Sequence, residues 1–226
     1  MPKLSIILTV YEINEQYLWE CLCSLYAQTF QDFVIIAVND CSPKTNYDWL
    51  KAQEKVQYVY NEKNLGMSAS VNKAFGLVNT EYVVRLGSDD LFDPNLLHRE
   101  VSFLDRHKKY VAVCCEMQTF GNSSRYIRRP EEWDLQNALS YPHYHGYAGG
   151  MMFRASLLSK VRIMEKYHIC EDYDFHLQLM ECGKIRSIHE PLYFYRQHDA
   201  QVTSNSKHSY RMEVIKSIVR SHKKRP

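Results

Sequence analysis

Residues 83–94 read Val-Val-Arg-Leu-Gly-Ser-Asp-Asp-Leu-Phe-Asp-Pro and join an apolar run to a cluster of acids. The short run, rich in β-branched residues, predicts a buried strand that ends at Gly87-Ser88, directly before Asp89 and Asp90. In an open α/β sheet, ligands bind beyond the carboxyl ends of the strands. These carboxylates are therefore expected to meet a cation or a hydroxyl-rich ligand.

The adjacent acids Asp89 and Asp90 repel each other, so their pairing needs a physical reason. A hard cation such as Mg²⁺ or Mn²⁺ supplies one, because it takes carboxylate oxygens and leaves positions open for substrate phosphates. The alternative is a solvated turn before a helix that starts at Pro94, with Asp93 as its N-cap. The stretch alone leaves both alternatives open.

Length and composition indicate an ordinary globular protein of one domain. The chain has 226 residues, of which 45% are hydrophobic and 24% charged, and its 17 tyrosines suit a surface that binds sugar or base rings. The seven cysteines do not have the spacing of a disulfide framework or a zinc site, which favours reduced thiols in the cytoplasm. We expect no secretory signal and no membrane span, because no apolar run has the required length or flanks.

The charge is unevenly distributed along the chain. The net charge is +2, but residues 207–226 contain seven Lys or Arg and one acid, so the remainder carries −4. This basic segment has apolar residues at helical spacing, namely Met212, Ile215 and Val219. Three alternatives follow: a helix attracted to the inner, anionic face of a membrane, a helix packed on the domain with its charges exposed, or a nucleic-acid-binding tail. The third lacks a basic patch on the body.

Strands and helices alternate along the first half of the sequence. Strands are predicted at 4–10, 33–38, 56–60, 82–86 and 111–117, and helices start after Asn14, around 47–54, at 67–78 and at 94–108. This order predicts βαβ units and an α/β fold with a mostly parallel, doubly wound sheet. From residue 118 to residue 147 we expect loops and short elements over a binding face. A strand with Gly149 and Gly150, a helix that starts at Glu171 and is ended by Gly183, and a strand region at 185–195 broken by Pro191 should follow.

The order of these features resembles that of family 2 glycosyltransferases with the GT-A fold, over roughly residues 3–200. The resemblance rests on Ser5–Tyr11 as the first strand, Val38–Ser42 as a "V-D-D-G-S" turn, Asn64–Gly66 with Asn72 as an "N-x-G…A-R-N" segment, Leu86–Pro94 as "L-D-x-D-D…P", and Glu171-Asp172 as an acidic pair. It implies a single domain over residues 1–205, divided into a nucleotide-sugar-binding half (1–110) and an acceptor-binding half (111–205), followed by the basic helix or tail (206–226).

The resemblance also implies a role for each matching residue. Asp172 would be the general base of an inverting transfer, with Glu171 beside it as an orienting group. Asp89 would hold Mn²⁺ or Mg²⁺ together with Asp90 and His198, the last in a "Y-R-x-H" segment. Donor-binding positions would be Thr9, Tyr11, Asp40, Asn64, Gly66, Asn72, Ser88, Asp90, Gly149 and Gly150.

Each role has a simpler alternative that the residues alone leave open. Asp40 would otherwise close an Asx turn before Pro43, and the acids at 171–172 would otherwise only favour a helix dipole. His198 would be a surface histidine, and His143 and His145 would be either metal ligands or part of an aromatic rim for the acceptor.

Three segments depart from the family pattern, at four positions. Gly87 stands where the first acid of D-x-D is expected, Val71 where "A-R-N" has its arginine, and Asn39 and Cys41 where "D-D-G-S" has an acid and a glycine. Either Asp90 compensates for Gly87 or metal binding is weak. The expected activity is transfer of a sugar from a nucleotide-sugar donor, UDP-linked, to a saccharide or lipid-linked acceptor in polysaccharide biosynthesis. The rival is a degenerate nucleotide-sugar-binding module without catalysis.

Overall fold

The computed structural model describes residues 1–43, 47–140, 149–199 and 208–224. The strands are β1 (Leu4–Val10), β2 (Phe33–Asn39), β3 (Val56–Tyr60), β4 (Tyr82–Leu86), β5 (Leu91–Phe92), β6 (Tyr110–Gly121), β7 (Tyr126–Ile127), β8 (Glu132–Trp133), β9 (Met152–Arg154) and β10 (Lys184–Gln197). The α-helices are α1 (Glu15–Tyr26), α2 (Met67–Phe75), α3 (Leu96–Arg106), α4 (Leu135–Ser140), α5 (Glu171–Cys182) and α6 (His208–His222), and η1 (Asp48–Ala52) and η3 (Ala155–Ser159) are 3-10 helices.

The described strands form one sheet that runs through both halves of the chain. Its order is β3-β2-β1-β4-β9-β6-β10-β5, with β7 attached to β6 and β8 to β10. Pairing is parallel from β3 to β4 and between β6 and β10, whereas β9 runs antiparallel between β4 and β6. The predicted α/β fold with a mostly parallel sheet is confirmed.

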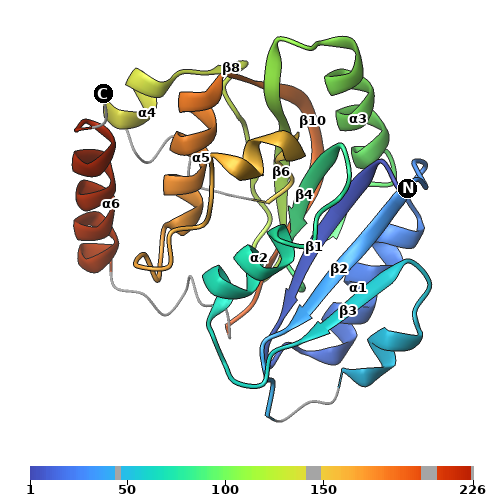
Figure 1. Cartoon of the computed structure of the whole chain (residues 1–226). Coiled ribbons are helices and arrows are strands. Elements are labelled where there is room, and N and C mark those ends of the chain that lie inside the picture. The colour runs from blue at the N-terminus through green and yellow to red at the C-terminus, as the bar shows by residue number, and fades with distance from the viewer. Residues whose placement is uncertain (44–46, 141–148, 200–207, 225–226) are drawn as a thin grey trace.

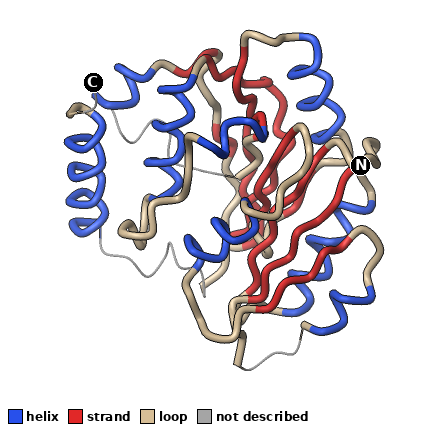
Figure 2. The backbone as a smooth tube through the Cα atoms, viewed as in Figure 1, coloured by secondary structure: helices blue, strands red, loops and turns tan. Residues whose placement is uncertain are grey.

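Helices cover both faces of the sheet, as Figures 1 and 2 show. One apolar core joins the sheet to α1 and α3, and a second joins it to α2, α5 and α6. β1 alternates between them, since Ile6 and Leu8 enter the first core and Ile7 enters the second. A strand buried on both faces explains the near-continuous apolar run of residues 4–10.

Three local expectations need correction. The helix expected from Pro94 starts at Leu96, because Asp93 Oδ1 accepts the Asn95 amide (2.9 Å) and forms a turn before it. The helix expected at 47–54 is the five-residue η1. β10 continues through Pro191, where a shift of register against β6 accommodates the missing N–H.

The basic C-terminal helix α6 packs on the body of the protein. Ile215 and Ile218 are buried in the core shared with α5. His222, also buried, lies between two carboxylates of α5: its Nε2 is 3.0 Å from Asp174 Oδ1 and its Nδ1 is 2.5 Å from Glu181 Oε1. The second of the three alternatives for this segment therefore describes the structure.

Replacing His222 with alanine is expected to lower the free energy of unfolding by about 3 kcal/mol, because it removes the imidazole that lies between the carboxylates of the buried Asp174 and of Glu181. Equilibrium urea unfolding measures this change. His98→Ala, at an exposed position on α3, is the control and should change stability by less than about 0.5 kcal/mol. Equal effects of the two substitutions would show that the His222 contacts do not anchor α6.

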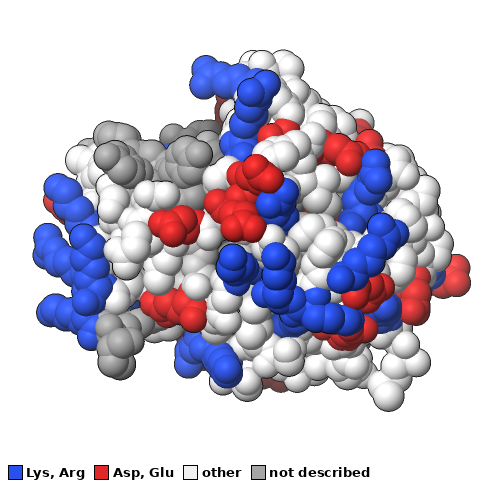
Figure 3. Space-filling model, turned by 90° about the horizontal axis from the view of Figure 1, so that it is seen from above, with Lys and Arg blue, Asp and Glu red and all other residues white. Residues whose placement is uncertain are grey.

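The outer face of α6 carries exposed basic residues, among them Lys216, Arg220, Lys223 and Lys224. Figure 3, which views the molecule from above Figure 1, shows Lys and Arg side chains gathered at the left edge, where α6 lies. Because the apolar face of α6 is occupied by α5 and the sheet, contact with an anionic surface would be electrostatic rather than by insertion. None of the helices in the described part of the chain is long and apolar enough to span a membrane.

Candidate active site

A cavity of about 1140 Å³ opens beyond the carboxyl ends of β1, β2 and β4. Its other walls come from the start of α5, the end of β10 and α6. It brings together most of the predicted site residues, namely Thr9, Tyr11, Asp40, Asn64, Gly66, Ser88, Asp89, Asp90, Gly149, Glu171, Asp172 and His198. The wall therefore combines segments from the whole length of the chain, as the topology of an open α/β sheet predicts.

Asp40, directly after β2, holds the loop before α2. Its Oδ1 accepts hydrogen bonds from Asn61 Nδ2 and the Leu65 amide, and its Oδ2 accepts one from the Gly66 amide, each at 2.8 Å. The Asx turn proposed as an alternative is made instead by Asn39, whose Oδ1 accepts the Ser42 amide (3.0 Å). Asp40 is 3% exposed and shapes the wall of the cavity.

Two residues of the "N-x-G…A-R-N" segment have different surroundings. Gly66 has a φ of +85°, which favours glycine, and its amide also donates to Asn64 Oδ1 (3.0 Å). Asn72 does not line the cavity. Its side chain accepts from the Ile163 amide (3.0 Å) and donates to the Ile163 carbonyl (2.8 Å), so it ties α2 to the loop before α5.

Asp89 and His198 face each other across the cavity floor. Asp89 Oδ2 lies 2.9 Å from His198 Nε2, and the imidazole ring packs on Tyr17 with 5.3 Å between centroids. Among the described residues no group of three or more His, Cys, Asp or Glu side chains is placed to hold a metal ion. A cation here would therefore complete its coordination with ligand or water oxygens, as Mg²⁺ often does.

Asp90 is surrounded differently from its neighbour. It is 3% exposed, its Oδ2 accepts a short hydrogen bond from the Tyr193 hydroxyl, and its Oδ1 accepts from the Arg196 amide at 2.8 Å. Burial, and then the charge of Asp89, raise the pKa of Asp90 to about 8. These contacts join the turn after β4 to β10, and each Asp90 oxygen already accepts one hydrogen bond from the protein.

The glycine at position 87 follows from the packing of Asp90. A Cβ atom at Gly87 would lie 2.4 Å from Asp90 Oδ2. An acid at this position would collide with Asp90 as long as Asp90 keeps its contacts with Tyr193 and Arg196. The departure from the D-x-D pattern thus accompanies an inward-facing Asp90.

Arg196 fixes the backbone of the acidic turn. Its Nε donates to the Asp89 carbonyl (2.7 Å), its Nη2 pairs with Glu20 Oε2 on α1 (2.6 Å), and its guanidinium lies 4.2 Å from the Tyr17 ring centroid. No role for Arg196 was predicted from the sequence, although it belongs to the "Y-R-x-H" segment. Arg196 thereby keeps Asp89 close to His198, which follows Arg196 by two residues in the chain.

Glu171 and Asp172 open α5, where the helix dipole favours negative charge. Asp172 is partly buried, and its Oδ1 accepts the Tyr173 amide (2.8 Å). Burial and then the charge of Asp172 raise the pKa of Glu171 to about 7, against the lowering effect of Arg85. The two adjacent carboxylates thus have different environments: Asp172 is the more exposed, and Glu171 is buried with a pKa close to neutral pH.

The glycine pair before β9 lies against Tyr193. A Cβ at Gly149 would be 2.2 Å from the Tyr193 ring, and Gly150 has a φ of +72°. Gly149 lines the cavity and Gly150 does not. Both precede the strand rather than lie in it, which corrects the expected strand boundary. His143 and His145 fall outside the described residues.

The structure adds two arginines to the cavity wall, Arg85 on β4 and Arg211 on α6. Arg85 could have been noticed as the single charge in an apolar strand-length run. Arg211 gives no such signal, because only the path of the chain brings α6 beside α5 and the cavity.

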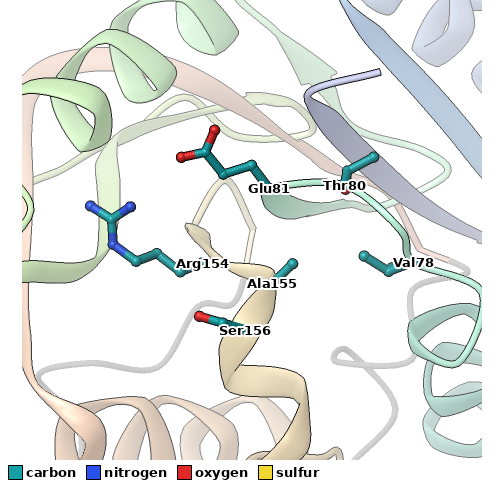
Figure 4. A pocket seen from close by; sticks show the side chains of 6 residues that line it. All are labelled: Val78, Thr80, Glu81, Arg154, Ala155 and Ser156. Atoms are coloured by element: carbon teal, nitrogen blue, oxygen red, sulfur yellow. The ribbon is translucent and has the colours of Figure 1, made fainter. Parts of the chain in front are cut away.

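A second, smaller hollow of about 500 Å³ lies at the opposite end of the sheet. Figure 4 shows its lining side chains, which come from Val78, Thr80 and Glu81 before β4, from Arg154 at the end of β9, and from Ala155 and Ser156 in η3. It shares no lining residue with the larger cavity. The predicted site residues do not contribute to it.

Comparison with known proteins identifies the family. Residues 5–162 match the family described as Glycosyl transferase family 2. The chain belongs to this family. The resemblance inferred from the sequence is therefore confirmed, and the inward-facing Asp90 with Gly87 is a feature of this family 2 glycosyltransferase chain.

Its relatives are longer than this chain. An uncharacterised glycosyltransferase of Rickettsia typhi is 29% identical over 91% of this chain and 67% of its own length, and one of Haemophilus influenzae is 26% identical over 98% and 73%. An uncharacterised glycosyltransferase of Methanocaldococcus jannaschii is 24% identical over 78% of this chain and 64% of its own length. The chain thus spans about two thirds of these relatives.

Solved structures confirm the fold. Residues 1–349 of S. aureus TarS, in a crystal structure with UDP-GlcNAc, match with a TM-score of 0.81 and 21% identity over 96% of this chain and 65% of that one. Another crystal structure of S. aureus TarS matches with a TM-score of 0.75 and 19% identity over 98% of this chain and 44% of that one. At these identities the likeness shows the fold alone.

Proposed function

We propose that this chain transfers a sugar, with inversion at the anomeric carbon, from a nucleotide-sugar donor to a hydroxyl of a saccharide or lipid-linked saccharide. One observation carries the proposal: a single cavity contains the Asp40-bound loop, the Asp89–His198 pair and the Asp172 carboxylate. The nucleobase of the donor, its diphosphate and the reacting hydroxyl of the acceptor each need one of these groups, and the three groups must lie in one place. Family membership and the structural match to a protein crystallised with UDP-GlcNAc support the choice of a UDP-linked donor.

Asp40 can serve a nucleobase while it holds its loop. A carboxylate oxygen has two lone pairs, and Asp40 Oδ2 accepts one hydrogen bond from the described part of the chain. The second lone pair is available to the N3–H of a uracil ring. Thr9 and Tyr11, which follow the line of β1 into the cavity, would contact the same ring; Tyr11 is 44% exposed and can stack on it.

The Asp89–His198 pair fits a divalent cation. Carboxylate and imidazole are both ligands that Mn²⁺ accepts, and Mg²⁺ is commonly bound by one or two protein groups together with substrate phosphates. When bound, such a cation would neutralise charge on the departing diphosphate. Arg196 and Tyr17 contribute by holding the two ligands in place.

Asp172 is the proposed general base. It would accept the proton of the acceptor hydroxyl while that oxygen forms a bond to the anomeric carbon. The bond between this carbon and the diphosphate oxygen breaks, and the electron pair leaves with the nucleoside diphosphate. Glu171, more buried and with its pKa near 7, would orient the acceptor and set the charge next to Asp172.

A donor screen tests the proposed activity. The purified chain is incubated with Mn²⁺, a mixture of saccharide acceptors and one nucleotide sugar at a time, and the released nucleoside diphosphate is measured. Release of UDP from a UDP-sugar is expected. Nucleotide binding without release from any donor would contradict the proposal and favour the degenerate binding module, with Gly87 and Val71 as marks of lost catalysis.

A further inference from the structure

Arg85 is a cation inside the cavity whose hydrogen-bonding capacity the protein leaves unused. It lies on β4, paired in register with Ile7 of β1, on the face of the sheet covered by α2 and α5. Its side chain lines the cavity together with Met67 and Glu171, the first residues of these two helices. The strand therefore contributes a guanidinium to the wall of the site.

The contacts of Arg85 within the described residues are weak or absent. Its Nη2 donates to the sulfur of Met67 at 3.2 Å, and a thioether is a weak acceptor. Its Nη1 is buried without a hydrogen-bond partner among the described residues, and its charge lowers the pKa of Glu171 without a direct ion pair to this carboxylate. Burying a guanidinium N–H without an acceptor is costly, so the site is built for an acceptor that comes from elsewhere.

The charge around the cavity indicates what this acceptor is. Most charged groups on the wall are acids, including Glu12, Asp89, Glu171 and Asp172. An anionic ligand entering such a wall needs a fixed positive charge close to its own. The planar fork of a guanidinium suits phosphate and carboxylate groups, each of which offers two oxygens.

We propose that Arg85 binds an anionic group of the nucleotide-sugar donor, either a phosphate of its diphosphate or a carboxylate on its sugar. This assignment rests on the proposed function. It places the donor's anionic group between the Asp89–His198 pair and the start of α5. On α2, which covers the same face of the sheet, the position expected to hold an arginine is the buried Val71. The arginine of the cavity thus lies on a strand of the sheet, β4, rather than on α2.

Calorimetric titration of Arg85→Met, Arg85→Lys and wild-type protein tests the assignment. If the group is a phosphate, Arg85→Met weakens UDP binding by about 10- to 100-fold and Arg85→Lys weakens it by less. Uridine, which has no phosphate, then binds all three proteins with equal affinity. If it is a sugar carboxylate, UDP binding is unchanged, and the substitution removes a preference for UDP-glucuronate over UDP-glucose. Arg99→Met, at an exposed residue paired with Glu190 outside the cavity, is the matched control.

The outcomes separate this assignment from the proposed function. Wild-type protein that binds no nucleotide would overturn both. Wild-type protein that binds UDP, with unchanged affinities for every ligand in Arg85→Met, would overturn the assignment alone. Thermal unfolding checks that the variants fold: Arg85→Met should melt no lower than wild type, because it removes a buried unpartnered N–H. If Arg85→Met does not fold, Arg85→Lys carries the comparison, since it keeps the charge and loses the fork.

Discussion

Replacing Asp172 with asparagine is expected to lower the rate of sugar transfer by about 1000-fold while leaving nucleotide affinity unchanged. The amide has the shape of the carboxylate, and its oxygen can still accept the Tyr173 amide, so the start of α5 keeps its structure. What it loses is the ability to take a proton from the acceptor hydroxyl, and general bases contribute about 10²- to 10⁴-fold. Steady-state rates, with nucleotide titrations in parallel, measure both quantities.

Glu171→Gln is the matched comparison at the neighbouring position. It should reduce the rate less than Asp172→Asn, and it should also change the pH profile. With a pKa of about 7, Glu171 ionises as the pH rises through neutrality, and its negative charge then favours the positive charge that develops at the anomeric carbon. The wild-type rate should therefore rise between about pH 6 and 8, and this rise should be smaller in Glu171→Gln. A larger loss in Glu171→Gln than in Asp172→Asn would exchange the two roles.

Replacing Asp89 with alanine is expected to reduce turnover by about 100-fold or more and to abolish the dependence of donor binding on divalent cations. The substitution removes the carboxylate that faces His198, and with it the charge that would bring a cation to the diphosphate. Turnover measured against Mn²⁺ concentration gives the apparent metal affinity. His198→Ala should shift this affinity in the same direction.

Asp93→Asn, in the same acidic turn, is the control for Asp89. Asparagine can accept the Asn95 amide as Asp93 does, so the turn before α3 is kept while one negative charge is lost. Metal dependence should be unchanged. A variant of Asp89 that keeps the wild-type response to Mn²⁺ would remove the cation site from the account.

The parts of the fold that could be predicted are those fixed by local pattern. The runs at 4–10 and 33–39 are apolar because these strands are buried on both faces, and no long-range information was needed to find them. Asp89 could be placed beyond the end of a strand from the local pattern alone, whereas the role predicted for Asp172 came from the resemblance to the family, because an acid at the start of a helix is common.

Other features depend on contacts between distant segments. Asp89 and Asp90 are adjacent and chemically identical, yet one faces the cavity and the other is buried against Tyr193 and Arg196, more than 100 positions away. Similarly, Asn72 is held by Ile163, and α6 becomes a wall of the cavity because Ile218 packs beside α5. A periodic pattern shows which residues are apolar but not which partner covers them.

Arg85 shows a signal that was present but not used. A charged residue in the middle of a buried strand needs hydrogen-bond acceptors, and the described residues leave Arg85 Nη1 without one. An isolated charge in an apolar run is therefore a useful pointer to a ligand when the strand leads into a cavity.

The central claim is that this cavity binds a nucleoside diphosphate with the help of a divalent cation. Calorimetric titration of the wild-type chain with UDP and GDP, each with and without Mn²⁺, tests it most directly. We predict saturable binding of UDP that weakens markedly when Mn²⁺ is removed by a chelator. UDP affinity that is equal with and without the metal would contradict the assigned role of Asp89 and His198, and no binding of either nucleotide would contradict the account as a whole.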